Sequence, residues 1–400
     1  MNKLNLIIDF NNILMRGLNT PGMTFYNSNY EDEHDLADIV KKLAIDICYN
    51  IRLFKPNRAI LVCDSPNAWR KDILPKDESG YKANRIKDDT KNWNNIWKIV
   101  KEFKDILKSK GIIISEIDRA EADDLAALWK YQLYTLKNES IVYISSDKDW
   151  RQLVDYNNVH NNFCVIFNPC VNNKGRKKLF LTDNCLNYIN SSSNNCNTDP
   201  INALFFDNTQ YNIKESITNA LSTDRKIDTE IIDGFDVLVH KIFEGDMSDN
   251  VPSYFNYYKT TKRGTNIVGI TPSQVKKLTE NLNINSITDL VDAELYVKPE
   301  LEKIIKMDIS VDAHERLNRQ RILVELNHTL FPETIINNFN NIFQELYEII
   351  MPTNLYNIKW TDVLANTRFL DINKDFKPQE NKIFSDLSAD GFNKYFTKLF

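Results

Sequence analysis

Short runs of apolar residues alternate with amphipathic stretches along the first part of the chain. The runs are rich in Ile, Leu and Val, as buried strands are, and lie at residues 3–10, 58–64, 112–116 and 141–145. The stretches between them repeat apolar side chains at helical spacing, over residues 35–54, 92–109 and 122–136. This alternation predicts a three-layer α/β core with a central, mostly parallel sheet. Ligands of such folds bind at the carboxyl ends of the strands.

The pattern changes beyond a core predicted at residues 1–156. Asparagine is frequent over residues 157–230, so we predict an extended surface insertion there. A second, α-helical domain is expected at 231–350, from helical patterns near 234–244, 271–283, 311–327 and 335–350. The remaining residues, 351–400, form a tail of weaker patterning.

Composition and charge narrow the possible functions. No apolar run approaches the roughly 20 residues that span a bilayer, so we expect no membrane contact. The six cysteines show no CxxC spacing, which suits reduced residues of a cytoplasmic protein. The net charge is −5, yet residues 70–110 hold twelve Lys/Arg against seven Asp/Glu, and residues 259–277 hold five Lys/Arg and no acid. Basic stretches beside an acidic centre suit a nucleic acid, although each stretch alone is equally typical of a solvated helix face.

Carboxylates occur in five clusters where predicted strands end or helices begin. A single cluster of this kind is usually a helix cap or a solvated group. Carboxylates gathered at one sheet edge repel each other, however, and hard divalent cations with oxygen ligands relieve that repulsion. Nine acids exceed what one ion requires, so we predict two Mg²⁺ ions, for which Mn²⁺ can substitute, and phosphoryl-transfer chemistry. The nine are Asp9, Asp64, Glu121, Asp123, Asp124, Asp147, Asp149, Asp246 and Asp249.

The order of these motifs resembles the structure-specific 5′-nucleases. That family includes flap endonucleases, phage 5′→3′ exonucleases and the 5′-nuclease domain of bacterial DNA polymerase I, and the resemblance is greatest to the T-even phage ribonuclease H type. It is carried by IIDFNNIL, LVCDSPNAWRKD, YKANR, EADD, YISSDKDWRQL and EGDMSDNVPS. The resemblance implies a PIN-like core and a C-terminal helical DNA-binding domain with a helix-hairpin-helix-like element. After GDMSDNVP the chain has few of the glycines usual in that element, so we expect a degenerate form.

The resemblance also implies roles for the acidic and basic residues of the site. One metal would be held mainly by Asp9, Asp64, Glu121 and Asp123, and the second by Asp147, Asp149, Asp246 and Asp249, with Asp123 or Asp124 near the boundary. Lys82 and Arg85, at the base of a helical arch over residues 82–110, would act in catalysis together with Asp147. Fixed positive charge there would stabilise the negative charge of the transition state.

Nucleic-acid contacts are expected on both sides of the acidic centre. Arg70 would hold a phosphate or pair with a site carboxylate, and Tyr81 would stack on a terminal base or pack in the core. Trp93 and Trp97, four residues apart, would contact single-stranded nucleic acid or pack inward. The further basic residues expected to contact nucleic acid are Lys87, Lys91, Lys262, Arg263, Lys276 and Lys277.

The function implied by the resemblance is a 5′–3′ exonuclease and flap endonuclease of phage DNA replication. Its substrates would be DNA with a 5′ flap or nick and RNA–DNA hybrids, including RNA primers. The chain would act as a monomer in the host cytoplasm, and the last ten residues, GFNKYFTKLF, would dock on a single-strand-binding protein or sliding clamp, or pack on the core. Two alternatives remain: a non-catalytic nucleic-acid-binding relative, and a PIN-type ribonuclease acting on single-stranded RNA.

Overall fold

A mixed, mostly parallel sheet organises the computed structural model. The model describes residues 3–19, 28–73, 80–83, 89–172, 174–190, 213–223, 226–261, 264–309 and 313–372. Within them, eight strands form the central sheet in the order β3-β2-β1-β4-β6-β7-β8, and β5 pairs with β6. The first five of this order run parallel, and β7 is antiparallel to β6. The strands are β1 (Leu4–Asp9), β2 (Arg58–Val62), β3 (Ile113–Ser115), β4 (Ser140–Ile144), β5 (Asp155–Asn157), β6 (Asn162–Asn168), β7 (Lys177–Leu181) and β8 (Ile227–Ile231).

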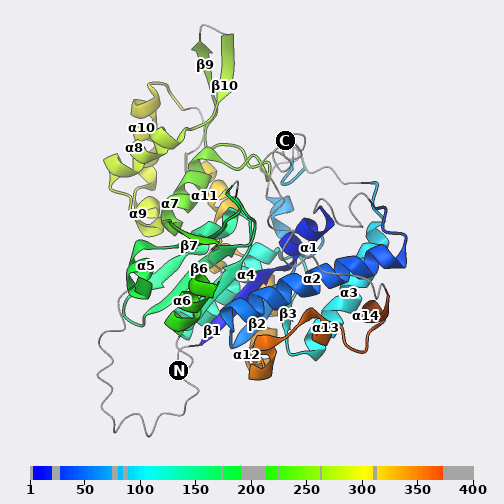
Figure 1. The fold of residues 1–400 in the computed structure, drawn as a ribbon. Helices are drawn as coiled ribbons and strands as arrows, with labels where there is room; N and C mark the ends of the chain where they lie inside the picture. Colours follow the sequence, from blue (N-terminus) through cyan, green and yellow to red (C-terminus); the bar gives the residue numbers. More distant parts are fainter. Residues whose placement is uncertain are drawn as a thin grey trace, which may run out of the picture.

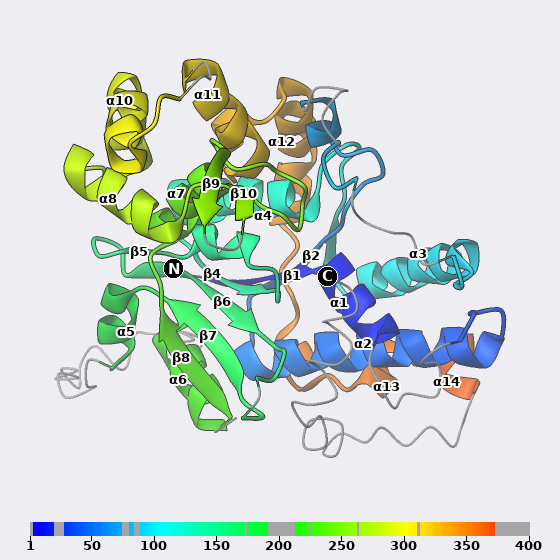
Figure 2. The same ribbon diagram turned by 90° about the horizontal axis from the view of Figure 1, so that it is seen from above.

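Helices cover both faces of this sheet, as the alternation of apolar runs predicted. Successive residues of a strand point to opposite faces. Leu6 and Ile8 accordingly belong to one apolar cluster, with the buried sides of α1 (Phe10–Leu18), α2 (Glu33–Phe54) and α3 (Trp93–Ser109). Ile7 belongs to a second cluster, with α4 (Ala122–Lys130) and α12 (Glu333–Tyr347). Figure 2 shows α2 and α12 on opposite sides of the sheet, so the three-layer α/β prediction is confirmed.

A third apolar cluster marks the helical C-terminal region. It joins residues of α7 (Gly234–Glu244), α8 (Pro272–Leu282), α10 (Glu294–Ile305) and α11 (Ala313–Val324), and it includes Tyr81 from the N-terminal half. The short helix α9 (Ile287–Asp292) lies between α8 and α10. The antiparallel hairpin of β9 (Tyr257–Thr261) and β10 (Gly264–Val268) projects from this region (Figure 1). The helical C-terminal region is thus confirmed, and a β-hairpin lies between α7 and α8.

The predicted insertion at residues 157–230 is wrong for much of that stretch. β6, β7 and β8 are strands of the central sheet, and the run from Phe163 to Phe167 is fully buried or nearly so. Helices α5 (Asp183–Asn190) and α6 (Ile213–Thr223) flank residues 191–212, which lie outside the described part of the chain. The short apolar runs form buried strands, although asparagines surround them in the sequence.

The arch predicted at residues 82–110 is wrong for its second half. α3 buries Ile96, Ile99, Val100, Phe103 and Leu107 in the first apolar cluster, so it is a covering helix of the core. Residues 84–88 lie outside the described residues.

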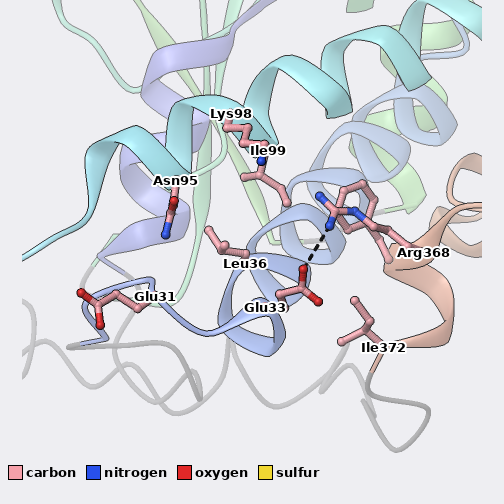
Figure 3. A pocket seen from close by; sticks show the side chains of 9 residues that line it. Glu31, Glu33, Leu36, Asn95, Lys98, Ile99, Arg368 and Ile372 are labelled. Atoms are coloured by element: carbon pink, nitrogen blue, oxygen red, sulfur yellow. Dashed lines mark hydrogen bonds and ion pairs between the residues drawn. The ribbon is translucent and has the colours of Figure 1, made fainter.

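The first part of the predicted tail packs on the core. Helices α13 (Trp360–Val363) and α14 (Arg368–Asp371) contact α2. Arg368 bonds to Glu33 (3.2 Å) on α2 and to Glu102 (2.7 Å) on α3, beside a small pocket shown in Figure 3. Residues 373–400, including GFNKYFTKLF, are outside the described residues. Among the described helices, none is both long enough and apolar enough to cross a bilayer.

Candidate active site

Three predicted carboxylates lie side by side at the carboxyl edge of the sheet. Asp9 ends β1, Asp64 follows β2 and Asp147 follows β4. Because β1 lies between β2 and β4, the loops that leave these strands diverge at this point of the sheet. A crevice where the strand order reverses is the usual ligand site of open α/β sheets.

Asp9 is buried and held by short hydrogen bonds. It caps α1 by accepting the Asn12 amide N–H (3.0 Å), and it accepts the Ser145 hydroxyl (2.8 Å). Burial, together with the charges of Asp64 and Asp147, raises the pKa of Asp9 to about 7. Asn12 in turn accepts the Ser146 hydroxyl (2.9 Å), so the last residue of the DFNN motif fixes the loop that carries Asp147.

Two further acids come from the start of α4, as the EADD motif predicted. Asp123 accepts the Trp150 indole N–H (2.5 Å). Burial, followed by the charge of Asp147, raises the pKa of Asp123 well above its usual range. Burial also acts to raise the pKa of Glu121, but Lys82 and Arg70 outweigh it, and the pKa lies below the ordinary value. Glu121 is therefore a stable anion, whereas the positive charge near Asp123 does not offset its burial and the charge of Asp147.

Asp124 faces the protein interior, contrary to its predicted role as a metal ligand. One of its oxygens bonds to Arg70 (2.6 Å), and the other accepts the Trp69 indole N–H and the Glu121 amide N–H, both at 2.9 Å. Its exposed fraction is 0%. Since both oxygens are engaged by protein groups, Asp124 supports the start of α4.

Arg70 is likewise an internal residue, so the structure does not present it to a phosphate. It is 1% exposed and pairs with Glu121 (3.1 Å) as well as Asp124. Its guanidinium also lies over the rings of Trp69 and Phe331, 4.7 and 5.7 Å from their centroids. Of the two roles considered from the sequence, pairing with site carboxylates is the one observed.

Tyr81 and Lys82 join the start of α4 to the GDMSDN turn. The Tyr81 hydroxyl is 3.1 Å from both Glu121 and Asp249, and its ring is buried, so it offers no face for stacking on a base. Lys82 Nζ lies 2.5 Å from Glu121 and 3.4 Å from Asp249, and its amide N–H donates to the Asp249 carbonyl (2.8 Å). The predicted catalytic lysine thus lies among the predicted ligands.

A lysine that the sequence analysis did not identify bridges the remaining two acids. Lys241, on α7, pairs with Asp149 and Asp246. Burial and the charge of Asp147 raise the pKa of Asp149 to about 7. Burial alone would raise the pKa of Asp246, but Lys241 lowers it below the ordinary value. One sequence signal could have indicated this role of Lys241. It lies five residues before Asp246, which is one helical turn plus the capping Gly245.

The other predicted basic residues lie on α8, just before α3 or outside the described chain. Lys276 and Lys277 are exposed on α8, where Lys276 lies 3.9 Å from Glu280. Lys91 is half-buried just before α3. The residues outside the described chain are Arg85, Lys87, Lys262 and Arg263.

The acids are neighbours without closing around a single point. In the described residues, no three His, Cys, Asp or Glu side chains form a ready ligand set for a metal ion. Lys82 and Lys241 each hold two of the carboxylates, Glu121 with Asp249 and Asp149 with Asp246. The site therefore has many oxygen donors at close range, with part of their charge offset by lysines and the rest uncompensated.

Comparison with known proteins places this site in context. Residues 5–181 match the family described as the 5′-3′ exonuclease, N-terminal resolvase-like domain. A solved pseudo-enzyme–product complex of the bacteriophage T5 flap endonuclease with DNA and metal ions is 15% identical, with a TM-score of 0.50, over 86% of this chain and 100% of that one. The T5 5′-exonuclease with bound zinc ions is 16% identical, with a TM-score of 0.49, over 87% of this chain and 99% of that one. Similarity at this level extends to the fold alone, and no curated protein matches the sequence.

Proposed function

We propose, from the premise that residues 5–181 belong to the 5′-3′ exonuclease family of nucleases, that this chain hydrolyses phosphodiesters near 5′ ends with two divalent cations. The observation that carries the proposal is the excess of buried negative charge at the carboxyl edge of the sheet. Asp9 and Asp149 have pKa values of about 7, and the pKa of Asp123 is higher than usual, because burial and neighbouring carboxylates oppose ionisation. A bound divalent cation would remove this cost.

The chemistry of the donors fits magnesium or manganese. All the candidate ligands are carboxylate oxygens, which hard cations prefer, and no described cysteine or histidine lies among them. We assign one cation to Asp9, Asp64, Glu121 and Asp123, and the second to Asp147, Asp149, Asp246 and Asp249. Asp124 is omitted because both of its oxygens are engaged.

The protein groups around the acids suit phosphodiester hydrolysis. When bound, divalent cations lower the pKa of a coordinated water and offset charge on the phosphate. Lys82 is held at the acids by Glu121 and Asp249, and its ammonium would neutralise charge developing on the phosphate. We assign the same role to Arg85. Ser145 and Asn12 fix the carboxylates of β1 and β4 before substrate binds.

The substrates proposed are 5′ flaps, nicked duplexes and RNA–DNA hybrids met in phage DNA replication. The basic stretch at residues 259–277, which runs from within β9 through β10 into α8, would hold the duplex through its phosphates. The T5 complex with DNA and metal ions, which has the same fold, supports this choice of substrate class.

The test is cleavage of a 5′-labelled flap and of an RNA-primed nick in Mg²⁺ by Asp147→Asn. We expect near-complete loss of cleavage with DNA binding retained, because Asp147 influences the pKa of Asp9, Asp123 and Asp149 and so lies centrally among the acids. Asp155→Asn is the matched control, since Asp155 pairs with Lys130 (3.0 Å) away from the site.

Each alternative function predicts its own result in this assay. A non-catalytic relative would bind the flap without cutting it, even as the native protein. A PIN-type ribonuclease would cut single-stranded RNA and leave the DNA flap intact. Normal cleavage by Asp147→Asn would contradict the assignment of the acids.

A further inference from the structure

The N-terminal turns of α3 present a pair of stacked tryptophans. The rings of Trp93 and Trp97 have centroids 6.0 Å apart and planes inclined by 27°. Trp93 is half-buried against the first apolar cluster, whereas Trp97 is 46% exposed. A large aromatic ring held by its neighbour and open to solvent is available for contact with another ring.

This pair lies on the side of the molecule where the acidic edge is. α3 leads directly into β3, which is parallel to β2, so its C-terminal end lies at the edge opposite the carboxylates. Lys104, farther along α3, lies 5.4 Å from the ring of Phe10, the residue that follows Asp9. Trp97 is seven residues closer to the helix start than Lys104, or about 10 Å at the helical rise. Trp97 therefore extends beyond the level of the acidic edge.

Helical spacing also fixes which way the pair faces. Trp93, Trp97 and Lys104 are separated by four and seven residues, so they share one face of α3. The opposite face carries Asn95, Lys98 and Ile99, which line the pocket beneath α14 in Figure 3. The described tail segment thus covers the opposite side of α3, whereas Trp97 is exposed among the described residues.

The charge near the pair suits a polyanion. Lys101 is exposed one turn along α3 from Trp97, and no acidic residue occurs between Asp89 and Glu102. Proteins that bind single strands without sequence preference combine aromatic rings, on which bases stack, with basic side chains along the backbone.

We propose that Trp97, stacked on Trp93, binds a base of the single-stranded 5′ arm of the substrate. The inference rests on the proposed function and adds to it a specificity surface for substrates that carry an arm. Lys101, four residues along α3 from Trp97, would neutralise a phosphate of the same arm. A nicked duplex has no arm and would not reach this surface.

The test compares substrates with and without the arm in three variants. Trp97→Ala removes the ring, Trp97→Phe keeps a ring for stacking, and Tyr296→Ala removes an exposed aromatic residue (64% exposed) from α10 as the control. Binding is measured with Ca²⁺ in place of Mg²⁺, and cleavage with Mg²⁺, on a 5′-flap duplex and a nicked duplex of the same sequence. Quenching of tryptophan fluorescence by an oligothymidylate reports stacking directly.

We expect Trp97→Ala to lower affinity for the flap relative to the nick by roughly 5- to 150-fold, the range for loss of one stacked base. Trp97→Phe should recover most of this loss, Tyr296→Ala should change nothing, and Trp97→Ala should reduce the quenching. An unchanged flap-to-nick ratio in Trp97→Ala would overturn the inference, as would equal weakening on both substrates. Failure of the native protein to cut either substrate would instead refute the proposed function, and the quenching assay would still test the aromatic surface.

Discussion

Replacing Arg70 by methionine tests the buried ion network that supports the start of α4. The guanidinium is 1% exposed and faces Asp124, which is 0% exposed, and Glu121, which is 5% exposed. Methionine keeps most of the packing of the side chain but leaves both carboxylates without this partner. Removing one member of a buried ion pair costs about 3–5 kcal/mol, a large share of the roughly 5–15 kcal/mol by which proteins are stable.

The free energy of unfolding is measured by urea titration, followed by tryptophan fluorescence and by circular dichroism. Arg119→Met is the matched control, because its pair with Asp72 is exposed, with side-chain exposures of 48% and 70%. Such exposed pairs contribute about 0–1 kcal/mol. Because Arg70 and Asp124 are in contact, Arg70→Met/Asp124→Asn should lose less stability than the sum of the single variants. A loss in Arg70→Met no larger than that in Arg119→Met would refute the buried network.

Three further predictions concern charge. Burial and nearby carboxylates raise the pKa of Asp9 and Asp149 from 3.8 to about 7. Between these two values the folded protein retains protons that the unfolded chain releases. The free energy of unfolding of the metal-free protein should therefore fall as pH rises from about 4 to 7. Thermal unfolding with a chelator at pH 5 and pH 8 measures this change in stability. Mn²⁺ should raise the unfolding midpoint more at pH 8 than at pH 5, and an equal rise at both pH values would contradict the prediction. Lys241→Met should destabilise the metal-free protein by leaving Asp149 and Asp246 to repel each other, and Mn²⁺ should stabilise this variant more than the native protein in the same melts. Neutralising the basic residues of the hairpin should weaken duplex binding and reduce the slope of log K against log salt by up to about 0.9 per charge, measured by fluorescence anisotropy; an unchanged slope would exclude phosphate contacts there. These residues are Lys259, Lys262 and Arg263.

Most strands and helices of the core could be predicted from the sequence because their hydrophobic periodicities are strong. The runs that became β1, β2 and β4 are almost wholly apolar, and α7 has the bounds that its pattern predicted. The failure at residues 157–230 has a physical reason. β6 is only seven residues long, and its apolar side chains are flanked by asparagines that dominate any average over a longer window. Burial depends on the neighbours in the sheet, which lie far away in sequence.

The positions of the acids at the strand ends could be predicted from the sequence, but the directions of their side chains could not. Spacing correctly indicated that acids meet at the strand ends, since parallel strands share an edge. It could not indicate that Asp124 points inward, because that depends on Trp69 and Arg70, more than fifty residues earlier. Lys241 was missed for the same reason: a lysine on an amphipathic helix is usually solvated, and its partner Asp149 is distant in the chain.

The contacts of residues 80–82 bear on how this protein can be divided. The matched domain ends at residue 181, yet Tyr81 packs among side chains of the helical region, and the Gly80 carbonyl accepts the Asn250 side-chain amide (3.0 Å). A fragment truncated at Leu181 would hold every residue of that domain and still expose the Tyr81 ring to water. Such a fragment would also lack Asp246 and Asp249. We therefore expect a fragment ending at Leu181 to be less stable than the whole chain, and a minimal version to need the helices through α11, which complete the cluster around Tyr81.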